Sequence, residues 1–114
     1  MRKLLLFLAL ACSACSKGPK ADVPAIGEAR SLAAEWALIN DQAAHGKLNR
    51  TYVGTMRASI REQLQEAASS LSQPDSAYGR EVQALLKEPE EAPAQDLRTH
   101  ADKLKQVEDS LESA

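Results

Sequence analysis

The two cysteines of this chain, Cys12 and Cys15, are the residues whose type and spacing first suggest chemistry. Two thiols three positions apart form a C-x-x-C pair, which works as a redox centre when a helix N-terminus in a βαβ setting activates one thiol. Here the pair instead closes an apolar run from Leu4 to Ala11, so we do not expect a redox centre. No cysteine follows Cys15, which excludes a disulfide framework in the rest of the chain.

The apolar run has the composition of a secretory signal peptide. Arg2 and Lys3 supply a positively charged start, and the eight residues from Leu4 to Ala11 are all apolar. This length lies within the range of about 7–15 residues that the apolar region of a signal peptide occupies. A helix needs about 20 residues to cross a bilayer, so the run is too short for a transmembrane anchor.

The residues around the cysteines resemble the lipobox of bacterial lipoprotein signal peptides. In that family a Leu, then Ala or Ser, then Gly or Ala precede the cysteine that is lipidated and becomes the first residue of the mature chain. Ser13 and Ala14 fit the two positions before Cys15, although Cys12 replaces the usual Leu. If Cys12 is the lipidated residue instead, only Ala11, directly before it, fits the pattern. We favour lipidation at Cys15, with Cys12 as the alternative, and the resemblance covers residues 1–15 only.

The resemblance implies a lipid-anchored protein of the bacterial cell envelope. We assign residues 1–14 to the signal peptide and residues 25–112 to a helical domain. Between them, residues 15–24 are expected to form the lipidated N-terminus and a flexible tether, because this stretch contains two prolines and a glycine. Either cysteine is followed by Ser and not by the Asp that commonly retains family members in the inner membrane, which favours the periplasmic face of the outer membrane.

Apolar residues recur at steps of three and four through most of the remaining chain, which predicts helices. We expect helices over residues 25–45, over residues 49–71, from Pro74 onward, and over residues 94–112. Gly46 is expected to end the first helix, and Ser72 is a candidate N-cap for the third. No segment shows the alternation of β-branched residues that a strand requires.

We therefore predict an all-α fold, a small bundle of about four helices with the first two packed as an antiparallel hairpin. The last helix has an apolar seam with heptad spacing, which includes Leu97, Leu104 and Leu111. The linker from Glu88 to Pro93 leaves open whether this helix packs on the others.

The remaining polar residues form no recognisable catalytic set. The two histidines, His45 and His100, belong to different predicted helices, and no further ligands stand at a zinc-binding spacing. His45 is expected to be the cation at the end of the first helix, and His100 a partly buried contact or a pH-sensitive one. No nucleophile, phosphate-loop or dinucleotide motif is present. We expect no enzyme activity, cofactor, metal or small-molecule substrate.

Positive charge is concentrated on the second predicted helix, where Arg50, Arg57 and Arg61 form a stripe beside the apolar face. These arginines could pair with acidic side chains of a neighbouring helix, contact anionic lipid headgroups, or dock an acidic protein partner. The chain as a whole has a formal charge of −2. This charge argues against general nucleic-acid binding, which requires a basic face.

From these observations we expect a structural or protein-interaction role at the envelope, with a protein partner or a second copy of the chain. One alternative is a periplasmic assembly factor, similar in architecture to a secretion-system pilotin, that binds a client helix. Another is a soluble secreted helical protein, released if ordinary signal peptidase cleaves after Ala9-Leu10-Ala11. The last alternative is a small envelope hydrolase, although no two carboxylates are recognisable as a catalytic pair.

Overall fold

The computed structural model describes residues 18–114, and within this range the chain is all-helical with no strand. The elements in chain order are a short 3-10 helix η1 (Pro19–Asp22), α2 (Val23–Ala44), α3 (Arg50–Ser69), α4 (Ala77–Leu86) and α5 (Ala94–Glu112). The predicted all-α fold of about four helices is confirmed. The predicted signal peptide, Cys12, Cys15 and the first tether residues lie outside the described residues.

The first long helix begins earlier than the sequence predicts. Pro19–Asp22 is already helical, α2 starts at Val23, and Asp22 is buried with 1% of its surface exposed. The prediction that residues up to 24 form a flexible tether is therefore wrong for residues 19–24. They belong to the folded body because Asp22 bonds to a distant loop.

Local capping explains where the other helices begin. The Asn49 side chain accepts a hydrogen bond of 2.8 Å from the Tyr52 N–H and starts α3. The Ser76 hydroxyl caps α4 by accepting from the Gly79 N–H at 3.1 Å. The predicted cap at Ser72 is wrong, and Pro74 lies in the loop before α4. A Cβ at Gly79 would collide with the Pro74 carbonyl, so this turn requires glycine.

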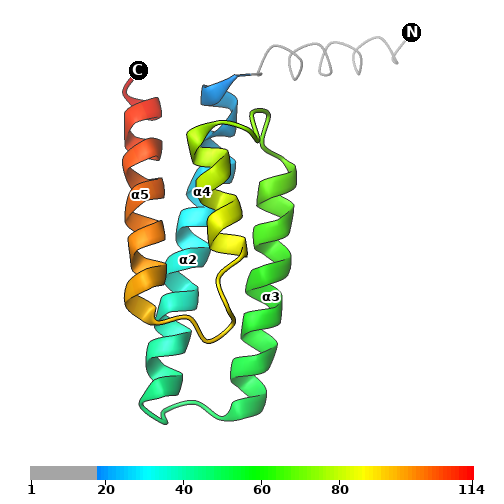
Figure 1. Cartoon of the computed structure of the whole chain (residues 1–114), viewed down its shortest axis with the longest axis vertical. Helices are drawn as coiled ribbons and strands as arrows, with labels where there is room; N and C mark the ends of the chain where they lie inside the picture. The colour runs from blue at the N-terminus through cyan, green and yellow to red at the C-terminus, as the bar shows by residue number, and fades with distance from the viewer. Residues whose placement is uncertain (1–17) are drawn as a thin grey trace, which may run out of the picture.

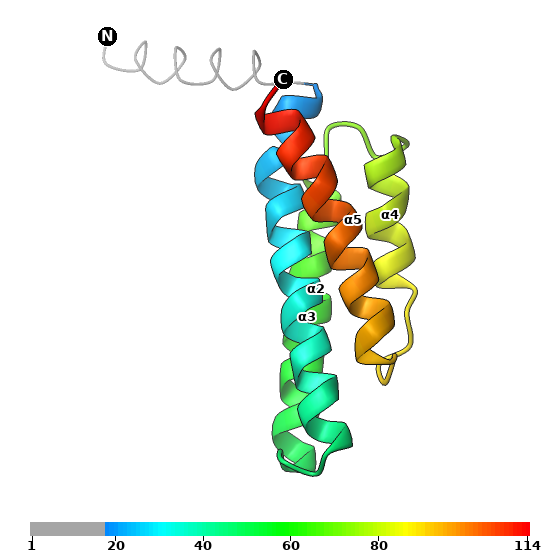
Figure 2. The same ribbon diagram turned by 90° about the vertical axis from the view of Figure 1, so that its left-hand side faces the viewer.

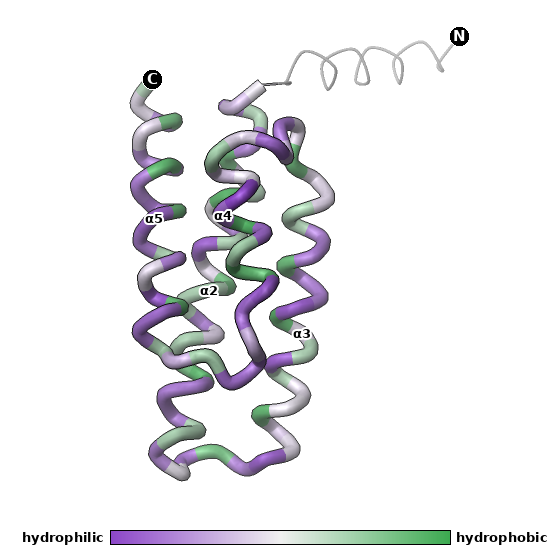
Figure 3. The backbone as a smooth tube through the Cα atoms, in the orientation of Figure 1, coloured by the Kyte–Doolittle hydropathy of each residue, from purple (hydrophilic) through white to green (hydrophobic). Residues whose placement is uncertain are grey.

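The bundle is built around α2 (Figure 1). The most extensive packing of α2 is against α5, and α3 returns beside α2 after the connection formed by residues 45–49. The short helix α4 lies against α3 and α5. Figure 3 shows hydrophobic residues recurring along each of the four longer helices. Their buried side chains form one core, whose fully covered large members are Ile26, Ile60, Leu64, Val82, Leu85, Leu97 and Leu104.

The last helix is part of this core, which answers the question that the Glu88–Pro93 linker left open. Leu97 and Leu104 have no exposed surface, and α5 lies along α2. An ion pair of 2.6 Å between Arg30 Nε and Glu108 Oε1 joins the two helices. Figure 2 shows that α4 and α5 end above the lower tip of the α2–α3 pair, which is left uncovered.

Asp22 fixes the N-terminal end of α2 to the α3–α4 loop. Its carboxylate accepts hydrogen bonds from the Ser72 N–H at 2.7 Å, the Gln73 N–H at 3.2 Å and the Tyr78 hydroxyl at 2.6 Å. Burial alone would raise the pKa of Asp22, but the hydrogen bonds from Ser72, Tyr78 and Gln73 outweigh it and hold this pKa below its ordinary value. Burial and the neighbouring carboxylate raise the pKa of Tyr78.

Leu104→Asp should lower the free energy of unfolding by at least about 3 kcal/mol, because it removes a buried side chain and places a carboxylate in the core. Gln106→Asp, which adds the same charge at an exposed position of α5, is the matched control. Urea denaturation measures both variants. Equal midpoints for Leu104→Asp and the control would mean that α5 does not pack on α2 in solution.

Asp22→Asn should destabilise the fold by about 2 kcal/mol at neutral pH, because an amide offers only one acceptor to three donors. In the unfolded chain Asp22 has its ordinary pKa of 3.8, which is higher than its pKa in the folded protein. The contribution of Asp22 to folding stability is therefore complete above the unfolded pKa, and it is lost as the pH falls through the folded pKa. Unfolding curves from about pH 6 to about pH 2 should show the difference between wild type and variant shrinking on the acid side.

The control for this experiment is Asp75→Asn, which changes an exposed carboxylate in the same loop. The free energy of unfolding of Asp75→Asn should differ little from that of the wild type at every pH. A difference between wild type and Asp22→Asn that stays constant through the acid range would contradict the lowered pKa of Asp22.

Candidate functional site

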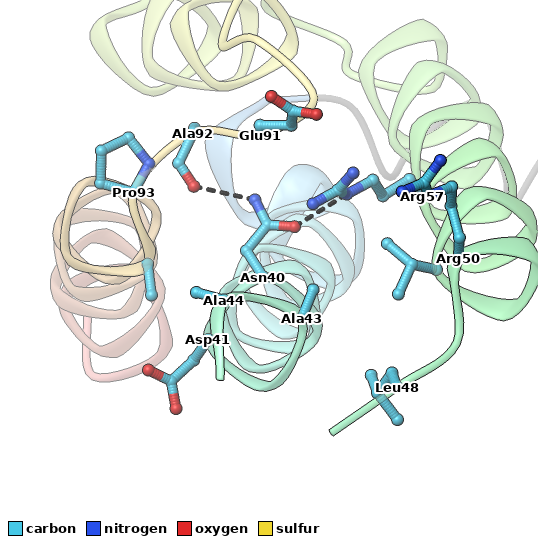
Figure 4. A pocket seen from close by; sticks show the side chains of 12 residues that line it. Asn40, Asp41, Ala43, Ala44, Leu48, Arg50, Arg57, Glu91, Ala92 and Pro93 are labelled. Carbon is cyan, nitrogen blue, oxygen red and sulfur yellow. Dashed lines mark hydrogen bonds between the residues drawn. The ribbon is translucent and has the colours of Figure 1, made fainter. Parts of the chain in front are cut away.

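A pocket lies at the uncovered tip of the α2–α3 pair. It has a volume of about 610 Å³ and lies between the end of α2, the start of α3 and the α4–α5 loop (Figure 4). The lining residues are Asn40, Asp41, Ala43, Ala44, Leu48, Arg50, Val53, Arg57, Glu91, Ala92, Pro93 and Ala94.

Asn40 is the polar centre of this pocket and is only 6% exposed. Its Nδ2 donates to the carbonyl of Glu90 at 3.0 Å and to the carbonyl of Ala92 at 2.8 Å. Its Oδ1 accepts from Arg57 Nε at 2.9 Å. One buried amide thus joins α2, α3 and the α4–α5 loop, and each of its polar atoms has a partner.

Two further side chains hold the same loop against the bundle. Trp36 Nε1 donates to the Glu90 carbonyl at 3.1 Å. Arg61 donates to the Leu86 carbonyl at 2.8 Å and to the Glu88 carbonyl at 3.1 Å. Its guanidinium carbon lies 5.5 Å from the centre of the Trp36 ring, a cation–π contact. The loop backbone is therefore bonded to side chains of α2 and α3.

The arginine stripe divides into residues with different roles. Arg57 and Arg61 bond within the molecule, but to an amide and to carbonyls, so the predicted pairing with acids of a neighbouring helix is wrong for these two. Arg50 is exposed and has no hydrogen-bond or ion-pair partner among residues 18–114. Arg50 and Arg57 line the pocket and Arg61 does not.

His100 joins α5 to α4 and to the loop that follows it. Its Nδ1 lies 2.6 Å from Glu81 Oε2, and its Nε2 lies 2.7 Å from Glu88 Oε2. The prediction of a partly buried histidine at a helix contact is confirmed. Both ring nitrogens can donate to the two carboxylates only when the ring is protonated. The alternative role as a pH-sensitive contact stays a prediction.

His45 takes the predicted place at the end of α2. It is the C-cap residue, and its Nδ1 lies 2.8 Å from the Asp41 carbonyl. The following Gly46 has a φ of 69°, the left-handed conformation expected after a helix end. His45 is more than 50 positions from His100 along the chain, and within the described range no three His, Cys, Asp or Glu side chains are placed to hold a metal ion.

Over residues 18–114, no helix combines the length and the apolar character that spanning a bilayer requires.

Sequence reasoning named Arg50 and Arg57 but missed Asn40 and Trp36 as parts of the site. A signal for Asn40 exists, since it directly follows Ile39 and lies four residues after Trp36, both in the apolar stripe of the first helix. A polar side chain beside such a stripe is partly buried, and buried polar groups need a hydrogen-bond partner. The partners themselves are backbone carbonyls, which no side-chain pattern reveals.

Comparisons with protein-family models, with curated proteins and with solved structures found no match to this chain. A function can therefore be inferred only from the residues of the chain and their arrangement.

Asn40→Ala should lower the free energy of unfolding by about 2–3 kcal/mol, because it removes the side-chain donor of the buried Ala92 carbonyl and the acceptor of Arg57 Nε. The Glu90 carbonyl keeps its bond from Trp36. Gln65→Ala removes an amide from an exposed position of α3 and should change stability little. Hydrogen exchange should show faster exchange of the loop amides, such as Ala92, in Asn40→Ala only. If both variants lose the same stability, Asn40 does not hold the loop.

Proposed function

We propose that this chain is a lipid-anchored helical protein of the bacterial envelope that acts by binding a protein partner and not by catalysis. The lipobox-like residues support anchoring through Cys15, or through Cys12 in the alternative register. Ser16, directly after Cys15, supports the periplasmic face of the outer membrane as its location. The helical body begins at Pro19, so only a few residues separate the proposed lipid from the fold.

The observation that carries this proposal is the position of the pocket at the end of the bundle away from the chain entry. The distance along α2 from Val23 to Asn40 is about 26 Å at 1.5 Å per residue. Figure 1 places the start of α2 at one end of the bundle and the connection to α3 at the other. A lipid at the N-terminus leaves the pocket free to face the periplasm. This supports a protein partner for Arg50 over lipid headgroups beside the anchor.

The second candidate is an assembly factor that binds a client helix. It is favoured by the apolar residues of the pocket, among them Ala43, Leu48 and Val53. A client side chain could be buried against them, as in helix-in-groove recognition. The uncovered region extends over only the last turns of α2 and the first turns of α3, so a short segment suits it better than a long helix.

One observation on the described residues favours a structural role for the buried carboxylate over a catalytic one. Asp22 has a lowered pKa, whereas a catalytic general acid needs a raised one. A soluble secreted form remains the alternative if cleavage follows Ala11.

The proposal is tested by the mass of the protein extracted from membranes, with and without an inhibitor of lipoprotein signal peptidase. We expect a diacyl or triacyl mass on the peptide that begins at Cys15, and precursor that accumulates under the inhibitor. Cys15→Ser should abolish the modification, and Cys12→Ser, the matched control, should keep it. An unmodified chain that begins at Cys12 would show a soluble exported protein and would refute the anchor.

A further inference from the structure

We propose that the pocket binds a carboxylate of a peptide segment in the partner protein, with Arg50 and Arg57 holding the carboxylate. The apolar part of the lining would hold the side chain next to that carboxylate. This inference rests on the proposed function, because it names the chemistry of the partner that the anchored protein would bind.

Arg57 is held ready for a ligand by the fold itself. Its Nε donates to Asn40 Oδ1, and Asn40 is fixed by two loop carbonyls. The terminal nitrogens of Arg57 make no hydrogen bond to any residue from 18 to 114. A guanidinium that is already oriented loses less side-chain entropy when it binds a carboxylate, and charged hydrogen bonds of this kind are strong.

Arg50 occupies a position that the helix itself does not favour. It is the first residue of α3, where the partial positive charge of the helix N-terminus repels a cation. It is exposed and without a partner in the described part of the chain. Arg50 and Arg57 are seven residues apart, which is close to two helical turns, so they project from the same face of α3. Both line the pocket, and Figure 4 shows them on its α3 side.

The rest of the lining argues for one carboxylate beside an apolar group and against a polyanion. Asp41 on α2 and Glu91 on the loop line other parts of the pocket and would repel a ligand of high negative charge. Leu48 and Val53 provide apolar surface next to the arginines. A volume of about 610 Å³ accommodates one or two residues of a peptide.

The test is an NMR titration of the isotope-labelled protein, purified in detergent as the cell produces it. The probe is N-acetyl-leucine, which has one carboxylate and one apolar side chain, and N-acetyl-leucinamide is its uncharged counterpart. We expect shifts at Val53 and Ala92 with the acid and none with the amide. Arg50→Gln should weaken binding about tenfold, as expected for loss of a charged hydrogen bond. Arg98→Gln, at an exposed position of α5, should leave it unchanged.

Added inorganic phosphate should not displace the acid if the site is built for a carboxylate with an apolar neighbour. No shifts with the acid, equal shifts with the amide, or equal binding by wild type and Arg50→Gln would each overturn the proposal. Displacement by phosphate at equal concentration would show a general anion site instead. All of these outcomes are independent of the lipid mass, so a failure here is distinguishable from a failure of the anchored-protein proposal.

Discussion

The path of the α4–α5 loop depends on hydrogen bonds that side chains of α2 and α3 donate to its backbone carbonyls, with Asn40 at their centre. A loop that crosses a helix buries polar backbone atoms, and each one without a partner costs free energy. Asn40 bonds two of these carbonyls, Trp36 bonds to Glu90 as well, and Arg61 bonds to Glu88 in the same loop. Because α5 begins directly after this loop, the position of Asn40 also sets where α5 starts along α2.

Two buried polar residues, one near each end of α2, give an otherwise apolar core a defined register. Within the described range, Asp22 and Asn40 are the buried polar or charged residues. Three of the eight buried residues of α2 are alanines, Ala29, Ala33 and Ala37, and such small side chains interlock less than large ones. Asp22 fixes the α3–α4 loop and Asn40 fixes the α4–α5 loop. The helix α4 between these loops is therefore positioned at both of its ends.

The sequence predicts the helices better than the connections. Periodicity placed the last helix within the range 94–112 that the structure shows, because a long apolar stripe needs no partner to be recognised. The predicted start of α4 was wrong because Ser72 and Ser76 are both suitable caps by residue type. In the structure Ser76 caps the helix, and the Ser72 N–H donates to Asp22, which lies 50 positions away. Distant bonds to backbone atoms leave no pattern in the sequence.

The pocket follows from the short length of α4. With 10 residues against the 20 of α3, α4 ends halfway down the bundle, and the loop must cross α2 there. The last turns of α2 and the first turns of α3 then remain uncovered. The loop that closes the fold is also the wall of the pocket, and Asn40 belongs to both. A ligand held by Arg57 would bind only when this loop is in place, so binding would stabilise the folded state by linkage. Stability and the proposed recognition at this end of the molecule would therefore depend on the same few hydrogen bonds.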